Sequence, residues 1–161
     1  MTNGSTNGKS RKAVDLKTAI MVGLEPKLRE DILVSIKVFW PNANVITASS
    51  WEEAVGEVGK TEGPTVLLVE YWDMLPEKLG QLRALPTPKV SDVSIIVSGH
   101  REDFIVSVGV MEAGADLYLL HPINPAELVA RMRAVLRRGP ILLKGSSPPT
   151  IVTKNLFVDF E

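Results

Sequence analysis

Acidic, hydroxyl and imidazole side chains follow several apolar runs of this sequence, at points where buried strands would return to solvent. Glu70 ends the run 66–69, and Ser98 and His121 each follow another such run. The carboxyl ends of parallel strands meet at one edge of a sheet, where ligand sites are commonly built. Glu70 is therefore either a working catalytic carboxylate or a residue that occupies the place of one.

The two histidines of the chain, His100 and His121, are expected near the same crevice. Two imidazoles suggest a metal site, but the sequence has no cysteine and few acids at suitable spacing, so we predict no bound metal. We expect His121 to form a hydrogen bond with Glu70 instead. The sequence contains no Walker loop, dinucleotide-binding glycine pattern or nucleophile elbow, and we predict no cofactor.

Five apolar runs predict buried strands, and a helical pattern follows each of them. The predicted strands are 18–22, 44–48, 65–70, 93–97 and 116–120. The predicted helices begin at Pro26, after the N-cap Ser50, near Leu79, at Phe104 and at Pro125. This alternation predicts an α/β fold, in which right-handed crossovers place helices on both faces of a parallel sheet.

The fourth of these helices has apolar residues at helical spacing. Phe104, Val108 and Met111 are expected to line it, and Gly114 to end it. The third helix is expected to be short and weak, with Leu79 and Leu82 as its apolar positions.

The composition predicts a small globular protein without a general affinity for polyanions or membranes. The chain has 161 residues, 45% of them hydrophobic, and a formal net charge of -1. No apolar run approaches the roughly 20 residues that span a bilayer. Residues 1–16 lack the apolar core of a secretory signal, so we expect a disordered polar tail and a cytoplasmic protein.

The segment EAGADLYLLHPINPAELVARMRAVLRR, residues 112–138, resembles the end of the receiver domain of two-component response regulators. The resemblance covers roughly residues 17–138. It implies the flavodoxin-like (CheY-like) fold, a five-stranded parallel sheet of strand order 2-1-3-4-5. Receivers of this family accept a phosphoryl group on an aspartate after the third strand, beside a magnesium ion held by two acids after the first.

The resemblance places the family's phosphorylation site on residues that differ from those of an active receiver. The corresponding positions here are Gly23, Leu24, Glu25, Glu70, Ser98 and His121. Gly23 and Leu24 replace the two magnesium-binding acids, Glu70 replaces the phosphoacceptor, and His121 replaces a lysine. Phosphoryl transfer depends on positioning and electrostatics, so these losses predict a degenerate site without catalysis.

The resemblance implies a pseudo-receiver, a regulatory module that works without phosphorylation and is not an enzyme. Glu70 would then act as a fixed negative charge, and Ser98 and Tyr118 would be the switch residues. One alternative is a functional phosphoacceptor receiver that uses Glu25 and Asp73 as replacement acids, although Asp73 is expected to cap the next turn. Another is a receiver-like sensor of small molecules, with a pocket between Leu24, Trp72 and His121.

The winged-helix (OmpR/PhoB-like) subfamily, which the sequence resembles, implies a homodimer through the fourth helix, fifth strand and fifth helix. The expected dimer face consists of Glu112, Asp116, Leu117, Arg131 and Arg133. Glu112 would pair with Arg133 and Asp116 with Arg131, while Leu117 replaces an acid and makes the face partly hydrophobic. A constitutive dimer is the preferred interpretation.

Residues 139–161 resemble a linker and the first strands of a winged-helix DNA-binding domain, with β-like runs at 141–143 and 156–160. No recognition helix follows within the sequence, so DNA binding is expected only through an effector domain beyond these residues. The other partner that the resemblance implies is a sensor kinase or another signalling protein.

Overall fold

The computed structural model describes residues 15–85, 90, 92–100, 104–138, 152–153 and 156–157. Five strands form one parallel sheet of order β2-β1-β3-β4-β5, so the predicted fold is confirmed. The strands are β1 (Thr18–Val22), β2 (Asn44–Ala48), β3 (Thr65–Glu70), β4 (Val93–Gly99) and β5 (Leu117–Leu120). The helices that connect and cover them are α1 (Pro26–Phe39), α2 (Trp51–Val58), α3 (Leu75–Arg83), α5 (Phe104–Glu112) and α6 (Pro125–Arg138).

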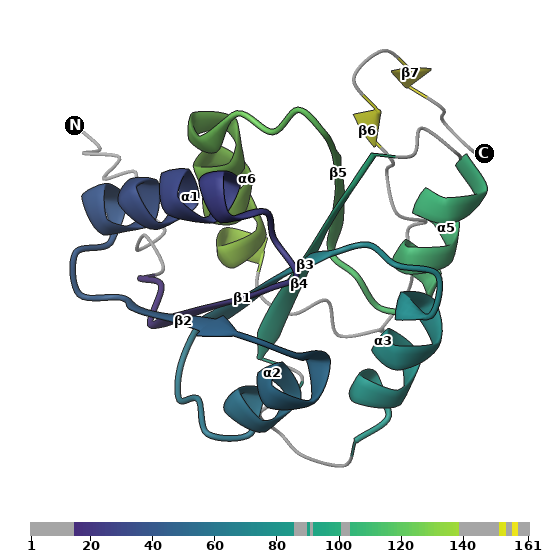
Figure 1. The fold of residues 1–161 in the computed structure, drawn as a ribbon, viewed down its shortest axis with the longest axis horizontal. Coiled ribbons are helices and arrows are strands. Elements are labelled where there is room, and N and C mark those ends of the chain that lie inside the picture. Colours follow the sequence, from purple (N-terminus) through teal and green to yellow (C-terminus); the bar gives the residue numbers. More distant parts are fainter. Residues whose placement is uncertain are drawn as a thin grey trace, which may run out of the picture.

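The sheet separates two apolar clusters, one on each face. Helices α1 and α6 cover one face, and α2, α3 and α5 cover the other (Figure 1). Alternate residues of β4 enter opposite clusters: Ile95 and Val97 face α2, α3 and α5, whereas Ile96 faces α1 and α6. This two-sided burial explains why the strands have continuous apolar runs rather than an alternating pattern.

Local signals set the ends of several elements. The Ser50 side chain accepts a hydrogen bond from the Glu53 amide at 3.1 Å and caps α2 as predicted. The Glu53 carboxylate accepts from the Ser49 amide at 2.9 Å. The short α3 is held by three buried leucines, Leu75, Leu79 and Leu82, which compensate for its weak helical pattern.

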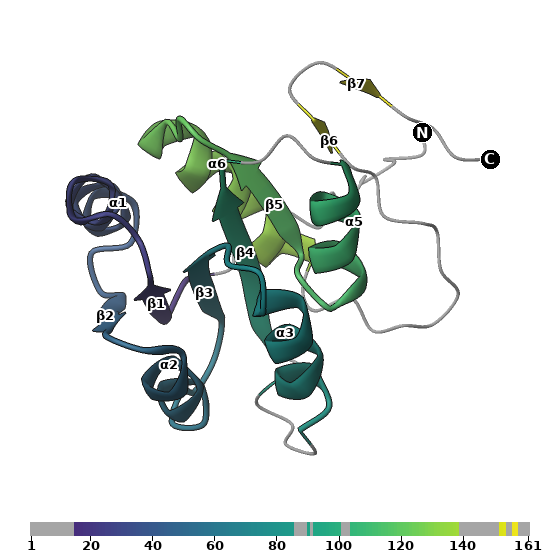
Figure 2. The same ribbon diagram turned by 45° about the vertical axis from the view of Figure 1, so that its right-hand side comes forward.

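The inner face of α5 differs from the prediction. Ser107 and Val110 are its buried residues, whereas Phe104 is exposed and Val108 and Met111 are half-buried. The segment FIVSVGVM is apolar on nearly every side, so its periodicity does not identify the face that packs on the sheet. The result is an apolar outer surface on α5, next to the edge strand β5 (Figure 2).

Asp116 lies just before β5, although the sequence predicted it as the first residue of the strand. Its carboxylate Oδ2 accepts hydrogen bonds from the Ile95 amide at 2.7 Å and from Arg83 Nη2 at 3.0 Å. Arg83 also donates to the carbonyls of Gly114, Val90 and Val93. Burial raises the pKa of Asp116 above its ordinary value, and the Ile95 amide and Arg83 oppose that rise. Asp116 and Arg83 therefore join α3, β4 and the start of β5 within one chain.

The described parts near the ends of the sequence bear on the predicted boundaries. Leu16 was expected to close the disordered tail, but it is buried in the cluster beneath α1 and α6. Near the other end, β6 (Val152–Thr153) pairs antiparallel with β7 (Leu156–Phe157), which falls within the second predicted β-like run. The first predicted run, 141–143, lies outside the described residues. Among the helices that the structure describes, none combines the length and apolar character needed to cross a membrane.

Candidate functional site

Glu70 lies at the end of β3, with its carboxylate held by one residue of β4 and one residue that follows β5. Ser98 Oγ donates a hydrogen bond to Glu70 Oε2 at 2.6 Å, and His121 Nε2 lies 2.9 Å from the same oxygen. The side chains of Glu70 and His121 are 23% and 14% exposed. The predicted contact between Glu70 and His121 is confirmed.

Strand pairing explains why these side chains meet. Glu70 is the register partner of Ser98 across β3 and β4, and Gly99 is the partner of Leu120 across β4 and β5. His121 follows Leu120, and its amide donates to the Gly99 carbonyl at 2.9 Å. The three strands thus end at one level, which places Glu70, Ser98 and His121 side by side.

His100 joins this group from the end of β4. Its ring stacks on that of His121, with centroids 4.0 Å apart and planes inclined by 13°. Its Nε2 lies 3.9 Å from Glu70 Oε1, and its side chain is 76% exposed. The carboxylate of Glu70 therefore has one imidazole near each oxygen.

The residues after β1 do not fit a magnesium ion. Gly23 has no side chain, and its φ of 75° lies in the left-handed region that glycine adopts without strain. Leu24 is 7% exposed and belongs to the apolar cluster beneath α1 and α6. Glu25 is exposed and is the only acid that remains in this segment. Magnesium requires several hard oxygen ligands, which this segment does not supply.

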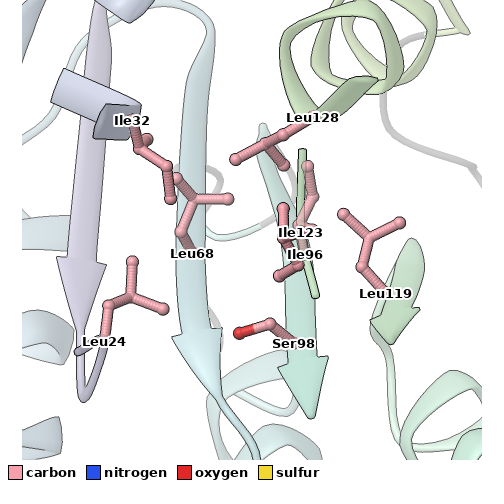
Figure 3. Close-up of a pocket in the computed structure, with 8 residues that line it drawn as sticks. All are labelled: Leu24, Ile32, Leu68, Ile96, Ser98, Leu119, Ile123 and Leu128. Atoms are coloured by element: carbon pink, nitrogen blue, oxygen red, sulfur yellow. The ribbon is translucent and has the colours of Figure 1, made fainter. Parts of the chain in front are cut away.

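Apolar side chains fill the space next to Leu24. Figure 3 shows Leu24, Leu68 and Ile96 gathered on one face of the sheet, with the Ser98 hydroxyl pointing toward β3. The cavity among them has a volume of ≈ 10 Å³, about the room that one water molecule needs. Trp72 does not cover this cavity, because it packs edge-on against Trp51 in the cluster on the opposite face.

Comparisons with known proteins bear on the family and the fold of the chain. No protein-family model matches the chain. It is 37% identical over 95 residues to the probable transcriptional regulator ycf27 of Porphyridium aerugineum, an alignment of 59% of this chain and 38% of that protein. It is 31% identical over 147 residues to the phosphate regulon transcriptional regulatory protein PhoB of Pseudomonas aeruginosa, an alignment of 89% of this chain and 60% of PhoB. The chain is homologous to the response regulators.

A solved structure supports the same fold. A putative response regulator from Chloroflexus aurantiacus matches with a TM-score of 0.62 and 22% identity, over 76% of this chain and 98% of that one. The matched curated relatives are longer proteins, of which this chain spans about 36% to 60%. The winged-helix subfamily fits these relatives, and the sheet described above is the fold of their receiver domains.

In this receiver fold, Tyr118 packs inward over the end of β4. Tyr118 pairs in register with Val97, is half-buried, and packs against the cluster beneath α2, α3 and α5. A Cβ atom added to Gly99 would clash with the Tyr118 hydroxyl and would lie 3.2 Å from Tyr71 Cβ. Only glycine at position 99 leaves room for the tyrosine hydroxyl, a feature that the sequence analysis missed.

Several residues of the predicted dimer face contact other residues of the same chain. Asp116 is bound by Arg83, and the Arg133 guanidinium lies 5.6 Å from the centre of the Phe39 ring on α1. Arg131 contacts Glu127 at 3.3 Å, one turn earlier on α6. Leu117 is half-buried against the cluster beneath α1 and α6. Glu112 is exposed. The pairs Glu112–Arg133 and Asp116–Arg131 remain predictions about two copies of the chain.

The outer surface of α5 is the feature of this region that sequence reasoning missed. Ile105 is 78% exposed, and Phe104 beside it is also exposed. The signal was present in the sequence as a helix that is apolar on both faces, which is typical of a helix that packs on two partners. The hydrogen bonds of Arg83 leave no comparable pattern in the sequence, because their acceptors lie 7 to 33 residues away along the chain.

The close approach of Tyr118 to Gly99 gives a test of the inward ring position. We expect Gly99→Ala to destabilise the protein by about 1–3 kcal/mol, because the added methyl group displaces the Tyr118 ring. In a Tyr118→Phe background, the same substitution should cost less by at least about 0.5 kcal/mol, since the hydroxyl is gone. Urea unfolding of the four proteins measures both values. Strict additivity of the two substitutions would contradict the contact.

Proposed function

We propose that this chain is the receiver module of a cytoplasmic transcriptional response regulator and acts without phosphorylation, through dimerisation. The observation that carries the proposal is the position of the Glu70 carboxylate. One of its oxygens contacts both Ser98 and His121. These are the positions whose family counterparts, a hydroxyl and a lysine, hold the oxygens of an aspartyl phosphate. Glu70 thus supplies a permanent negative charge where receivers place a transient one.

The surroundings of Glu70 support a permanent charge over a phosphoacceptor. Its Oε2 accepts a hydrogen bond from Ser98 and contacts His121, so the carboxylate itself occupies the hydroxyl and the cation-side position that would hold phosphate oxygens. Leu24 is buried where a magnesium ligand would stand, and phosphoryl transfer in receivers depends on a magnesium ion held at that position. The replacement acids of the alternative hypothesis, Glu25 and Asp73, are both exposed.

A small-molecule sensor has less support from the same region. Ligand pockets of ordinary metabolites have volumes of about 300–1,000 Å³. The cavity beside Leu24 offers ≈ 10 Å³, and Trp72 packs on the far face of the sheet.

Dimerisation is proposed through the apolar surface of α5 and the edge strand β5. Ile105 and Phe104 expose apolar area at the start of α5, and all four residues of β5 are half-buried. A second copy of the chain would cover both surfaces. Burial of apolar area would then stabilise the dimer in place of ion pairs, because Asp116 and Arg133 already contact residues of their own chain. DNA is proposed as a partner, through an effector domain, because the relatives are named as transcriptional regulators. A sensor kinase or another signalling protein is proposed from the resemblance to two-component response regulators.

Phosphorylation is tested with a small phosphodonor and Mg²⁺, followed by the intact mass of the protein. We expect no added phosphoryl group, because the chain lacks the metal ligands and the lysine that transfer requires. An active receiver treated in parallel shows that the donor works. A stable adduct on this chain would contradict the proposal.

The dimer surface is tested by the molar mass in solution without phosphodonor. We expect a dimer for the natural sequence and a dimer at least about tenfold weaker for Ile105→Asp, because the substitution places a charge in an apolar interface. Val38→Asp on α1 is the matched control, since Val38 is 68% exposed and lies on the opposite side of the sheet. A monomer for the natural sequence, or equal weakening by both variants, would exclude this interface.

A further inference from the structure

We propose that Glu70, His100 and His121 form a binding site for a divalent transition-metal ion of the zinc type. Ligand atoms of the three residues all lie within 4.8 Å of one another. This site is different in kind from the magnesium site of receivers, because its ligands are two imidazoles and one carboxylate. The inference does not rest on the proposed function, which concerns the metal-free chain, because a bound ion would neutralise the charge of Glu70. It replaces the sequence-based expectation that these histidines bind no metal.

The spacing of the ligand atoms is close to what such an ion requires. Zinc binds imidazole nitrogen and carboxylate oxygen at about 2.0–2.2 Å, so tetrahedral ligand atoms lie roughly 3.4 Å apart. Here the distances from the Glu70 carboxylate to the two Nε2 atoms are 2.9 Å for His121 and 3.9 Å for His100. Shifts of about half an ångström bring both distances to the required value. The exposed His100 ring must also turn out of its stack on His121, because imidazole binds a metal ion in the plane of the ring.

The backbone holds two of the ligands, while the third can adjust. Glu70 ends β3 and His121 follows β5, and both strands pair with β4, which lies between them. The Ser98 hydroxyl orients the Glu70 carboxylate. An outer hydrogen bond of this kind raises metal affinity by fixing the ligand. His100 is 76% exposed, so its ring can move toward an ion without repacking the core.

The contact between His121 and Glu70 offers a nitrogen and an oxygen to the same cation. His121 Nε2 and Glu70 Oε2 approach to 2.9 Å, the distance of a hydrogen bond with one proton between the two atoms, and a metal ion would replace that proton. The stacked ring of His100 adds a second imidazole nitrogen near the other carboxylate oxygen. Two histidines and one carboxylate suit zinc, nickel or cobalt, whereas magnesium prefers oxygen ligands alone. Three protein ligands leave at least one position for water or a partner group.

The composition of the chain makes the experiment selective. His100 and His121 are its only histidines, and it has no cysteine. Binding of a transition metal to the untagged protein therefore reports on this site. We expect one Zn²⁺ per chain by calorimetry with millimolar Mg²⁺ present, and the imidazole NMR signals of both histidines should shift together.

His100→Gln is the decisive variant, because the exposed side chain contributes little to folding. We expect it to weaken Zn²⁺ binding at least about tenfold, while Asp73→Asn, which removes an exposed acid three residues from Glu70, should leave binding within about twofold. Co²⁺ as a spectroscopic probe should give visible absorption bands that the His100 variant loses. Absence of saturable binding, or equal binding by His100→Gln and the natural sequence, would overturn the site. Neither outcome alters the phosphodonor test, so failure of one proposal is distinguishable from failure of the other.

Discussion

The carboxylate of Glu70, held between Ser98 and His121, is the contact on which the organisation of the site depends. It links the ends of three adjacent strands, β3, β4 and β5. A half-buried carboxylate is stable only when hydrogen bonds compensate for the lost water. The parallel register supplies those bonds, because it places a hydroxyl and an imidazole at the level where β3 ends.

The residues around this contact support the proposal of a fixed charge. Gly23 and Leu24 supply no carboxylate beside Glu70, and Leu24 joins the apolar cluster beneath α1 and α6. The inward Tyr118 ring rests on Gly99, one residue after Ser98. The charge of Glu70, the position of Tyr118 and the apolar α5 surface are the features on which we base the proposal of a receiver that acts without phosphorylation.

The sequence was sufficient to predict the fold and the core of the site. Five apolar runs separated by helical patterns permit few arrangements, and strand ends determine which residues meet. The contact between Glu70 and His121 followed from this reasoning. The stack of His100 on His121 did not, because it depends on the exact pairing of Gly99 with Leu120.

The dimer face shows where sequence reasoning is weakest. Charges on a helix surface have several possible partners, and the structure gives Asp116 and Arg133 neighbours within the chain. The inner face of α5 could not be assigned because the helix is apolar all round. Long-range contacts of arginine, such as that of Arg83 with Asp116, leave no local pattern.

The central claim is that the fixed charge of Glu70 maintains the associated form of the receiver. Its most direct test is the dimer dissociation constant of Glu70→Gln by analytical ultracentrifugation, since glutamine keeps the shape and hydrogen-bonding oxygen but removes the charge. The exposed Glu25→Gln serves as the control. We predict a dissociation constant at least about tenfold higher for Glu70→Gln than for the natural sequence or the control. Equal constants for all three proteins would contradict the account.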